Sequence, residues 1–229
     1  MNKCDNLFDN PTKRLPLCLC LDTSDSMNGY LIKELNAGLQ ALYDAINKDE
    51  ILQLSVDLSI VTFGGSVDNQ VNVIREFSNL MDETDAPILT SGGNIAIGKA
   101  LNKALDMLEA RKNRYKENGI DYYQPWMLLM TNKRLFGNEE CGDIECAQSR
   151  ISDMVDSSRL NMIVANIQSN PNLDELGKFS PTRKPIQLKS LGFSEFFANL
   201  SDYISTTVFV SSSRICIPLD EVIANWEGL

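Results

Sequence analysis

Three oxygen-bearing side chains follow one another directly after an apolar run near the start of the chain. The stretch "LCLCLDTSDSM" ends its apolar part at Asp22 and then offers Ser24 and Ser26, two and four residues further on. A carboxylate and two hydroxyls from a single turn are ligands that suit a hard divalent cation such as Mg²⁺. An aspartate or a serine placed there is also a candidate nucleophile, so the surrounding elements must decide between these chemistries.

Strands and helices are predicted to alternate around this stretch. Continuous apolar runs are typical of buried strands, and apolar residues at three- and four-residue spacing predict amphipathic helices. The expected strands are 15–22, 54–65, 69–77, 124–132 and 160–167. The expected helices are 28–49, 97–118, 141–158 and 193–212, followed by an extended end at 215–229. This order predicts an α/β fold with three layers: a doubly wound, mainly parallel central sheet with helices on both faces.

Three loops are expected to meet at one edge of this sheet. In open parallel α/β sheets, ligands bind in the crevice beyond the carboxyl ends of the strands. The loops that follow or face those ends are 22–26, "TSGGN" at 90–94 and "TNKR" at 131–134. Together their side chains predict a cage of oxygen ligands.

Composition excludes several other classes of protein. The chain has 229 residues, of which 43% are hydrophobic, so we expect one domain with a proper core. The formal net charge is −10 and the basic residues form no long run, which disfavours nucleic acid as a partner. The sequence shows no apolar stretch of signal-peptide or membrane-span length, so we expect a cytoplasmic protein without a membrane partner.

The six cysteines do not predict a structural zinc site. The chain has no histidine and no paired CxxC units, and reduced thiols fit the cytosol. Cys18 and Cys20 are expected on one face of a buried strand. Two interpretations stay open for Cys141 and Cys146: they pair or bind a metal, or they are ordinary thiols of a surface loop or helix, which we favour.

Several ordered landmarks resemble one known family. "DTSDSM" resembles the DxSxS signature of the metal-ion-dependent adhesion site in von Willebrand factor type A (vWA) domains, and it follows the first strand as it does there. With "VTFGG", "SGGNIAIGKAL", "GIDYYQPWMLLMTN" and "GFSEFFANLSDYIS", the chain is similar to the bacterial tellurium-resistance TerY-like branch. The resemblance covers nearly the whole chain. It implies a leader at 1–15, a vWA domain at 16–212 and a C-terminal extension at 213–229 that packs on or beside the domain.

The resemblance also implies a set of metal ligands. The retained ones are Asp22, Ser24 and Ser26, while Asn94 stands where the branch usually has threonine and Asn132 where it usually has aspartate. Because the second amide removes a full negative charge, we expect weak or conditional binding of Mg²⁺, or of Mn²⁺ or Ca²⁺, and an empty or repurposed site is the alternative. Asp25, at a position often held by glycine, is expected to compensate as a nearby charge or as an alternative ligand.

The function that the resemblance implies is metal-assisted protein–protein interaction rather than catalysis. In the family, an acidic side chain of the partner completes the coordination of the ion. The branch implies an adaptor in a bacterial stress response such as tellurite resistance, with a protein kinase and a protein phosphatase of the same system as partners. A metal-dependent phosphohydrolase and a metal-free degenerate scaffold are the alternative hypotheses.

Other catalytic interpretations fit the residues less well. Gly93, Gly98 and Lys99 have the spacing of a phosphate-binding loop, but Ala100 stands where that motif needs a hydroxyl. An aspartyl phosphotransferase of the haloacid-dehalogenase pattern would need a second aspartate where Ser24 stands. As a hydrolase nucleophile, Ser24 would lack a histidine base and the usual glycine-flanked turn.

A metal-free version of the site is also considered. Lys133 and Arg134 directly follow Asn132 and are either solvated loop residues or a source of positive charge in place of a cation. In the second case, the site would recruit an acidic segment without metal.

Overall fold

Six strands form one sheet within the described part of the chain. The computed structural model describes residue 10 and residues 12–65, 70–81, 83–132, 141–167, 173–188 and 192–210. The strands are β1 (Leu15–Asp22), β2 (Val56–Phe63), β3 (Val71–Ser78), β4 (Trp126–Thr131), β5 (Asn161–Asn166) and β6 (Ile186–Gln187). Their order across the sheet is β3-β2-β1-β4-β5-β6, and every neighbouring pair is parallel except β2 with β3. The predicted fold class is therefore confirmed.

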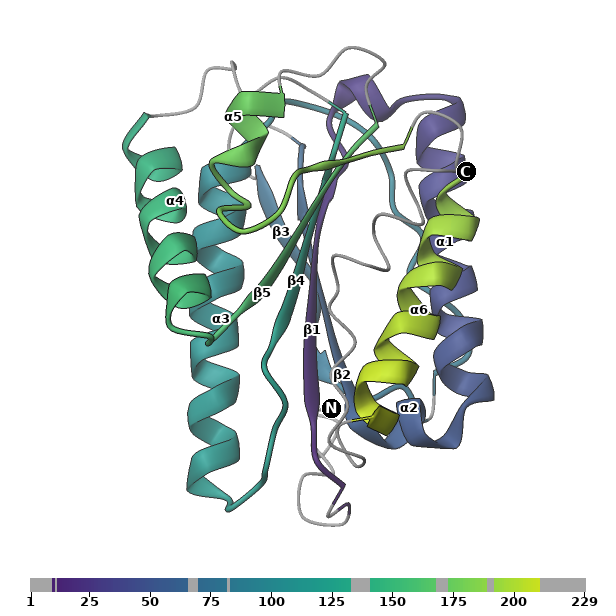
Figure 1. Ribbon diagram of the computed structural model, residues 1–229. Coiled ribbons are helices and arrows are strands. Elements are labelled where there is room, and N and C mark those ends of the chain that lie inside the picture. The colour runs from purple at the N-terminus through teal and green to yellow at the C-terminus, as the bar shows by residue number, and fades with distance from the viewer. Residues whose placement is uncertain are drawn as a thin grey trace.

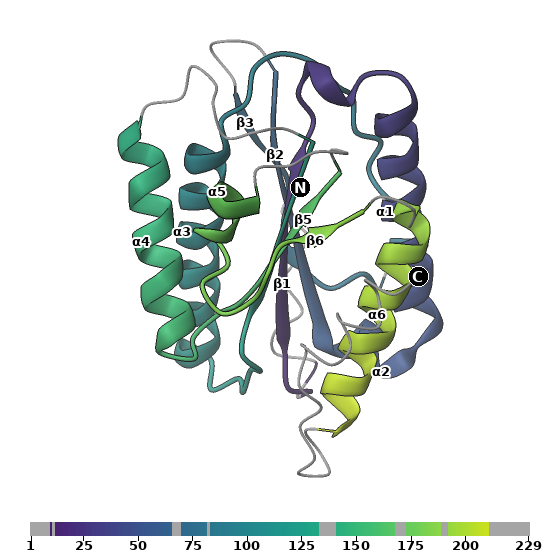
Figure 2. The ribbon, with the colours of Figure 1, turned by 45° about the horizontal axis from the view of Figure 1, so that its top comes forward.

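Helices cover both faces of the sheet (Figure 1). They are α1 (Tyr30–Lys48), α2 (Glu50–Ser55), α3 (Ile97–Glu117), α4 (Cys141–Asp156), α5 (Leu173–Gly177) and α6 (Phe193–Val210), with a short 3₁₀ turn η1 (Asp25–Met27) after β1. The helices α1, α2 and α6 lie on one side, and α3, α4 and α5 lie on the other, as the turned view in Figure 2 also shows. The result is the three-layer arrangement expected from the alternating sequence.

Each face of the sheet has its own hydrophobic core, and β1 contributes to both. Its leucines at 15, 17, 19 and 21 pack with α1 and α6, whereas Cys18 and Cys20 pack with α3. All eight residues of β1 are buried, which explains why its sequence is apolar up to Asp22 rather than alternating. Both thiols are free, and the hydrogen bond with Cys18, together with burial, raises the pKa of Cys20. Cys146 is an exposed free thiol of α4.

Most predicted elements are confirmed, and the differences have local causes. Leu54 and Ser55 were expected in a strand but lie in α2, a helix that the sequence analysis missed. The carboxylate of Asp49 accepts hydrogen bonds from the backbone N–H groups of Ile51 and Leu52, so it caps a new helix one residue after α1 ends. The short elements α5 and β6 were also missed, because five and two residues are too few to establish a period.

Some predictions fall outside the described residues. They concern Lys133, Arg134, the side chain of Cys141 and the extended end at 215–229. The division of the chain at residues 15 and 212 stays a prediction. Within the described ranges, no helix combines the length and apolarity needed to cross a membrane.

Candidate metal centre

Asp22 is the last residue of β1, and the topology of the sheet places it between two other strand ends. It pairs with Phe63 at the end of β2, and Leu21 pairs with Met130 one residue before β4 ends. Asp22 is completely buried. A carboxylate in such a position needs hydrogen-bond donors or a counter-charge, because burial without them is very costly.

Neutral groups of the protein supply those donors. The Oδ1 atom of Asp22 accepts from the backbone N–H of Ser24 at 2.9 Å. Its Oδ2 atom accepts from the hydroxyl of Thr131 at 2.9 Å and from the backbone N–H of Asn132 at 3.1 Å. These bonds orient the carboxylate and stabilise its charge without neutralising it. The negative charge therefore remains available to a cation.

The two serine hydroxyls lie side by side next to this carboxylate. The Oγ atoms of Ser24 and Ser26 are hydrogen-bonded at 2.9 Å, with Ser24 buried directly before η1 and Ser26 half-buried within it. Adjacent oxygen ligands of an octahedral Mg²⁺, with bonds of about 2.0–2.1 Å, also lie about 2.9 Å apart. The hydrogen-bonded hydroxyl pair is therefore also compatible with two neighbouring ligands of such an ion.

Asn132 joins the third loop to the first through a hydrogen bond. Its Nδ2 donates to the backbone carbonyl of Ser26 at 3.0 Å, and the residue is half-buried. With the nitrogen used in this way, Oδ1 is the atom of the amide that can serve as a ligand. The side chain retains a ligand oxygen but brings no charge.

The second loop is attached to the first through backbone contacts. The backbone N–H of Asp25 donates to the carbonyl of Gly93 at 3.1 Å, and the N–H of Gly93 donates to the Oδ1 of Asp25 at 2.8 Å. Gly93 has a φ of +68°, and a Cβ there would lie 1.4 Å from the carbonyl oxygen of Gly65, so only glycine fits. Asn94 is exposed, and its backbone N–H donates to Gly65 at 3.2 Å. The Asp25 carboxylate thus holds the loop that carries Asn94.

The structure brings four of the five predicted ligands into one hydrogen-bonded cluster. These are Asp22, Ser24, Ser26 and Asn132, and Asn94 lies on the loop joined to that cluster. The donor set consists of oxygen atoms with a single buried carboxylate, which fits a hard cation bound through few charges. In the described ranges, no three His, Cys, Asp or Glu side chains come together in a way that could hold a metal. A cation here would therefore depend on hydroxyl and amide oxygens.

Sequence reasoning missed Thr131, whose hydroxyl donates to Asp22. The available signal was a polar residue at the end of an otherwise apolar strand, directly before Asn132.

The glycine pattern at 93–99 has a packing explanation instead of a phosphate-binding one. A Cβ on Gly98 would lie 2.6 Å from the backbone of Asp143 in α4, so glycine allows α3 and α4 to pack closely.

Fold and site geometry together define an α/β domain with a candidate cation site at the carboxyl edge of its sheet. The sequence model of the von Willebrand factor type A domain family matches residues 17–206, and the chain belongs to this family. A search of curated proteins found no match to the chain.

Solved structures with the same fold are distant in sequence. The manganese-loaded TRAP protein of Plasmodium vivax is 18% identical, with a TM-score of 0.53 over 75% of this chain and 64% of that one. Proximal thread matrix protein 1 from the mussel byssus, with a zinc-occupied metal-ion-dependent adhesion site, is 15% identical, with a TM-score of 0.52 over 88% and 46%. The pilus adhesin SpaC of Lactobacillus rhamnosus GG in its open conformation is 13% identical, with a TM-score of 0.62 over 84% and 30%. The chain spans less than two thirds of each of these proteins, and at these identities the likeness concerns the fold.

Proposed function

We propose that this chain is a protein-interaction module that holds a divalent cation weakly and presents it to an acidic partner. Asp22, Ser24, Ser26 and Asn132 would hold the ion, with Asn94 completing the set from the second loop. The observation that supports the proposal is the buried Asp22 carboxylate, which accepts hydrogen bonds from three neutral donors in the described part of the chain and lies next to two hydroxyls. Mg²⁺ is the ion that this oxygen set fits best, with Mn²⁺ or Ca²⁺ as substitutes.

Charge explains why the ion would matter for the partner. The chain has a formal net charge of −10, so its own field repels an acidic segment. A bound cation would supply local positive charge and a coordination position for a partner carboxylate. Because Asn132 replaces a carboxylate, the site has fewer ligand charges, and its affinity for the ion is expected to be low.

We further propose a non-enzymatic adaptor role in the cytoplasm of a bacterium. This finer assignment is supported by the resemblance to the tellurium-resistance TerY-like branch, which suggests a stress response and a kinase and a phosphatase as partners. The site offers one buried carboxylate and no histidine base, which supports binding rather than hydrolysis.

A metal-free scaffold is the second candidate, and one observation favours it. Both oxygens of Asp22 already accept hydrogen bonds from the protein, so the carboxylate is satisfied without an ion. In that case Asp22 would stabilise the three loops, and partner binding would not depend on a cation.

Calorimetric titration of the full chain with Mg²⁺ and Mn²⁺ tests the proposal. We expect saturable binding that Asp22→Ala abolishes and that Asp153→Ala, which removes an exposed carboxylate of α4, leaves unchanged. Affinity capture from a bacterial extract, with and without chelator, then tests partner dependence on the same variants. Absence of cation binding, together with partner capture that is equal in Asp22→Ala and wild type, would support the scaffold instead. Phosphate release that requires both Asp22 and Mg²⁺ would point to the phosphohydrolase.

A further inference from the structure

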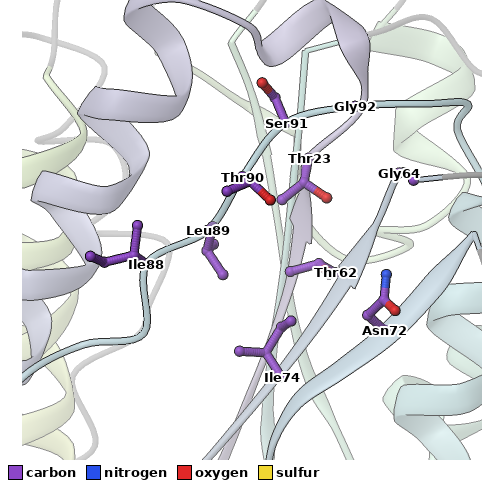
Figure 3. Close-up of a pocket in the computed structure, with 11 residues that line it drawn as sticks. Thr23, Thr62, Gly64, Asn72, Ile74, Ile88, Leu89, Thr90, Ser91 and Gly92 are labelled. Atoms are coloured by element: carbon purple, nitrogen blue, oxygen red, sulfur yellow. The ribbon is translucent and has the colours of Figure 1, made fainter.

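A pocket of about 280 Å³, whose lining residues are drawn in Figure 3, includes Thr23 of the loop that carries the candidate metal centre. It is formed by the ends of β2 and β3 and by the segment 88–92. Side chains from three regions line it: Thr62 from β2, Asn72 and Ile74 from β3, and Ile88, Leu89 and Thr90 from the segment. Thr23, between Asp22 and Ser24, lines the pocket as well, so the pocket and the metal centre share one loop.

The chemistry of the lining favours an uncharged occupant. None of the eleven lining residues carries a charge. The backbone N–H groups of Gly64, Gly65 and Gly92 all donate to carbonyl groups of the protein, so they are not available to an anion. A charged side chain entering here would lose water and meet no counter-charge among the described residues that line the pocket.

Polar and apolar side chains share the lining of the pocket, and its apolar side chains lie together on one side. Ile88 is 86% exposed and Ile74 is 42% exposed, and Leu89 lies behind them, almost completely buried. Single exposed apolar residues are common on proteins, but two isoleucines bordering one concave site are typical of a binding surface. The volume of the pocket is nearly twice the roughly 150 Å³ of an apolar cavity that accommodates benzene. It is at the lower limit of drug-sized ligand pockets. The size therefore suits one or two aliphatic side chains.

The wall of the pocket is fixed in place by α1. Asn36 donates from Nδ2 to the carbonyl of Leu89 at 2.9 Å and accepts the N–H of Leu89 at 2.8 Å. Gln40 accepts the N–H of Ala86 at 2.9 Å, and its Nε2 donates to Thr84 at 2.9 Å. Because these bonds hold the segment before Ile88 and directly after it, the pocket is formed before any partner arrives. Binding there would require little ordering of the protein.

Backbone contacts link the pocket to the metal centre. The N–H of Gly92 donates to the carbonyl of Thr23 at 2.8 Å, and Gly93, the next residue, contacts Asp25. A partner segment whose carboxylate approaches Asp22, Ser24 and Ser26 would place residues a short distance along its chain over Thr23 and the pocket.

We infer that this pocket binds a branched aliphatic side chain, from Val, Leu or Ile, of the same partner segment whose carboxylate approaches the metal centre. The inference rests on the proposed function for the position of the carboxylate. It gives the partner a recognisable chemistry: an acidic residue and an aliphatic residue at a constant offset. Charge selects the segment at the metal centre, and shape and apolarity select it at the pocket.

Selection from a random peptide library with one fixed aspartate, displayed to the full chain in Mg²⁺, tests the inference. We expect enrichment of Val, Leu or Ile at one constant offset from the aspartate. Ile88→Ser is expected to weaken the selected peptides at least fivefold. The matched control Ile51→Ser alters an isoleucine of α2 that is 45% exposed and is expected to leave binding unchanged. Because Ile88 is so exposed, its variant should fold, and a thermal melt verifies this.

The possible failures of the two proposals differ. Peptides that require Asp22 and Mg²⁺ but show no aliphatic preference would overturn the inference and leave the proposed function in place. Aliphatic peptides that depend on Ile88 but not on Asp22 or Mg²⁺ would support the pocket and contradict the proposed function. A library without any binding peptide would overturn both.

Discussion

Two buried carboxylates lie at opposite edges of the sheet, and their surroundings differ. Asp22, at the carboxyl edge, receives three hydrogen bonds from neutral donors. Asp57, near the amino end of β2, receives two bonds from the guanidinium of Arg111, at 2.6 and 3.1 Å, and one from the hydroxyl of Tyr115. Arg14 adds a second guanidinium, with its Nη1 3.9 Å from Asp57 Oδ1.

The difference shows which carboxylate is prepared for an external cation. Asp57 already has the positive charge of two almost completely buried arginines, so it serves as the centre of an internal ion cluster that ties α3 to β2. Within the described residues Asp22 has hydrogen bonds but no counter-charge, and it lies next to a loop with two hydroxyl oxygens. Both residues are equally buried, so exposure alone would not separate them.

The largest expected effect is on stability at the amino edge. Asp57→Asn would leave the guanidinium groups of Arg14 and Arg111 buried without their counter-charge, and we expect the free energy of unfolding to fall by about 3–5 kcal/mol. Urea unfolding followed by circular dichroism measures this. Asp153→Asn, at an exposed position, is the control. A loss equal to that of the control would mean that the cluster contributes little.

A smaller loss of unfolding free energy is expected from a substitution at the carboxyl edge. Asp22→Asn removes a charge whose donors in the described residues are neutral, and among those residues it leaves no buried cation unpaired, so we expect a fall of about 1–3 kcal/mol in the free energy of unfolding. The same variant should lose any rise in melting temperature that Mg²⁺ gives the wild type, since a ligand stabilises only the state that binds it. If the variant matched Asp57→Asn in stability loss, the contrast between the two edges would be wrong.

Restoring a carboxylate in the third loop should strengthen the metal centre. Asn132→Asp adds a full negative charge beside Asp22, and we expect Mg²⁺ to bind on the order of tenfold more tightly. Asn113→Asp adds the same charge at an exposed position of α3 and controls for net charge. Titration calorimetry measures the Mg²⁺ affinity of both variants. Equal Mg²⁺ affinities of the two variants would show that the ion binds elsewhere.

The amino edge, where Tyr115 contacts Asp57, should make the free energy of unfolding depend on pH at high pH. Burial, followed by the charge of Asp57, raises the pKa of Tyr115 well above its usual range. Above about pH 10 an unfolded tyrosine releases its proton while folded Tyr115 keeps it, so this residue makes stability fall by about 1.4 kcal/mol per pH unit. Below that pH both states are protonated and no dependence arises.

Comparison with Tyr115→Phe isolates this contribution. The variant should show a shallower loss of unfolding free energy between about pH 10 and 11, the interval that begins at the ordinary tyrosine pKa. Urea unfolding at several pH values measures the two slopes. Parallel slopes for the two proteins would show that Tyr115 ionises normally in the folded state.

Local patterns predicted which loops meet at the candidate metal centre better than they predicted the residues that support those loops. The residues 22–26 stand out because an apolar run ends in three oxygen donors, and the rule for strand ends correctly predicted that the loop at 131–132 joins them. Thr131 was missed because one hydroxyl at a strand end has no periodic signal. The Arg111–Asp57 pair was missed because 54 residues separate its members.

The sequence by itself determined the three-layer fold and the oxygen donors after β1, since hydrophobic period and residue type are local properties. Only the tertiary structure decided which partners each buried carboxylate receives and that Ile74, Ile88 and Thr23 border one pocket. The physical reason is that hydrogen bonds, charge pairing and concavity depend on distances between segments. Those distances are set by the register of β1 with β2 and β4 and by the amides of α1 that hold the segment between β3 and α3.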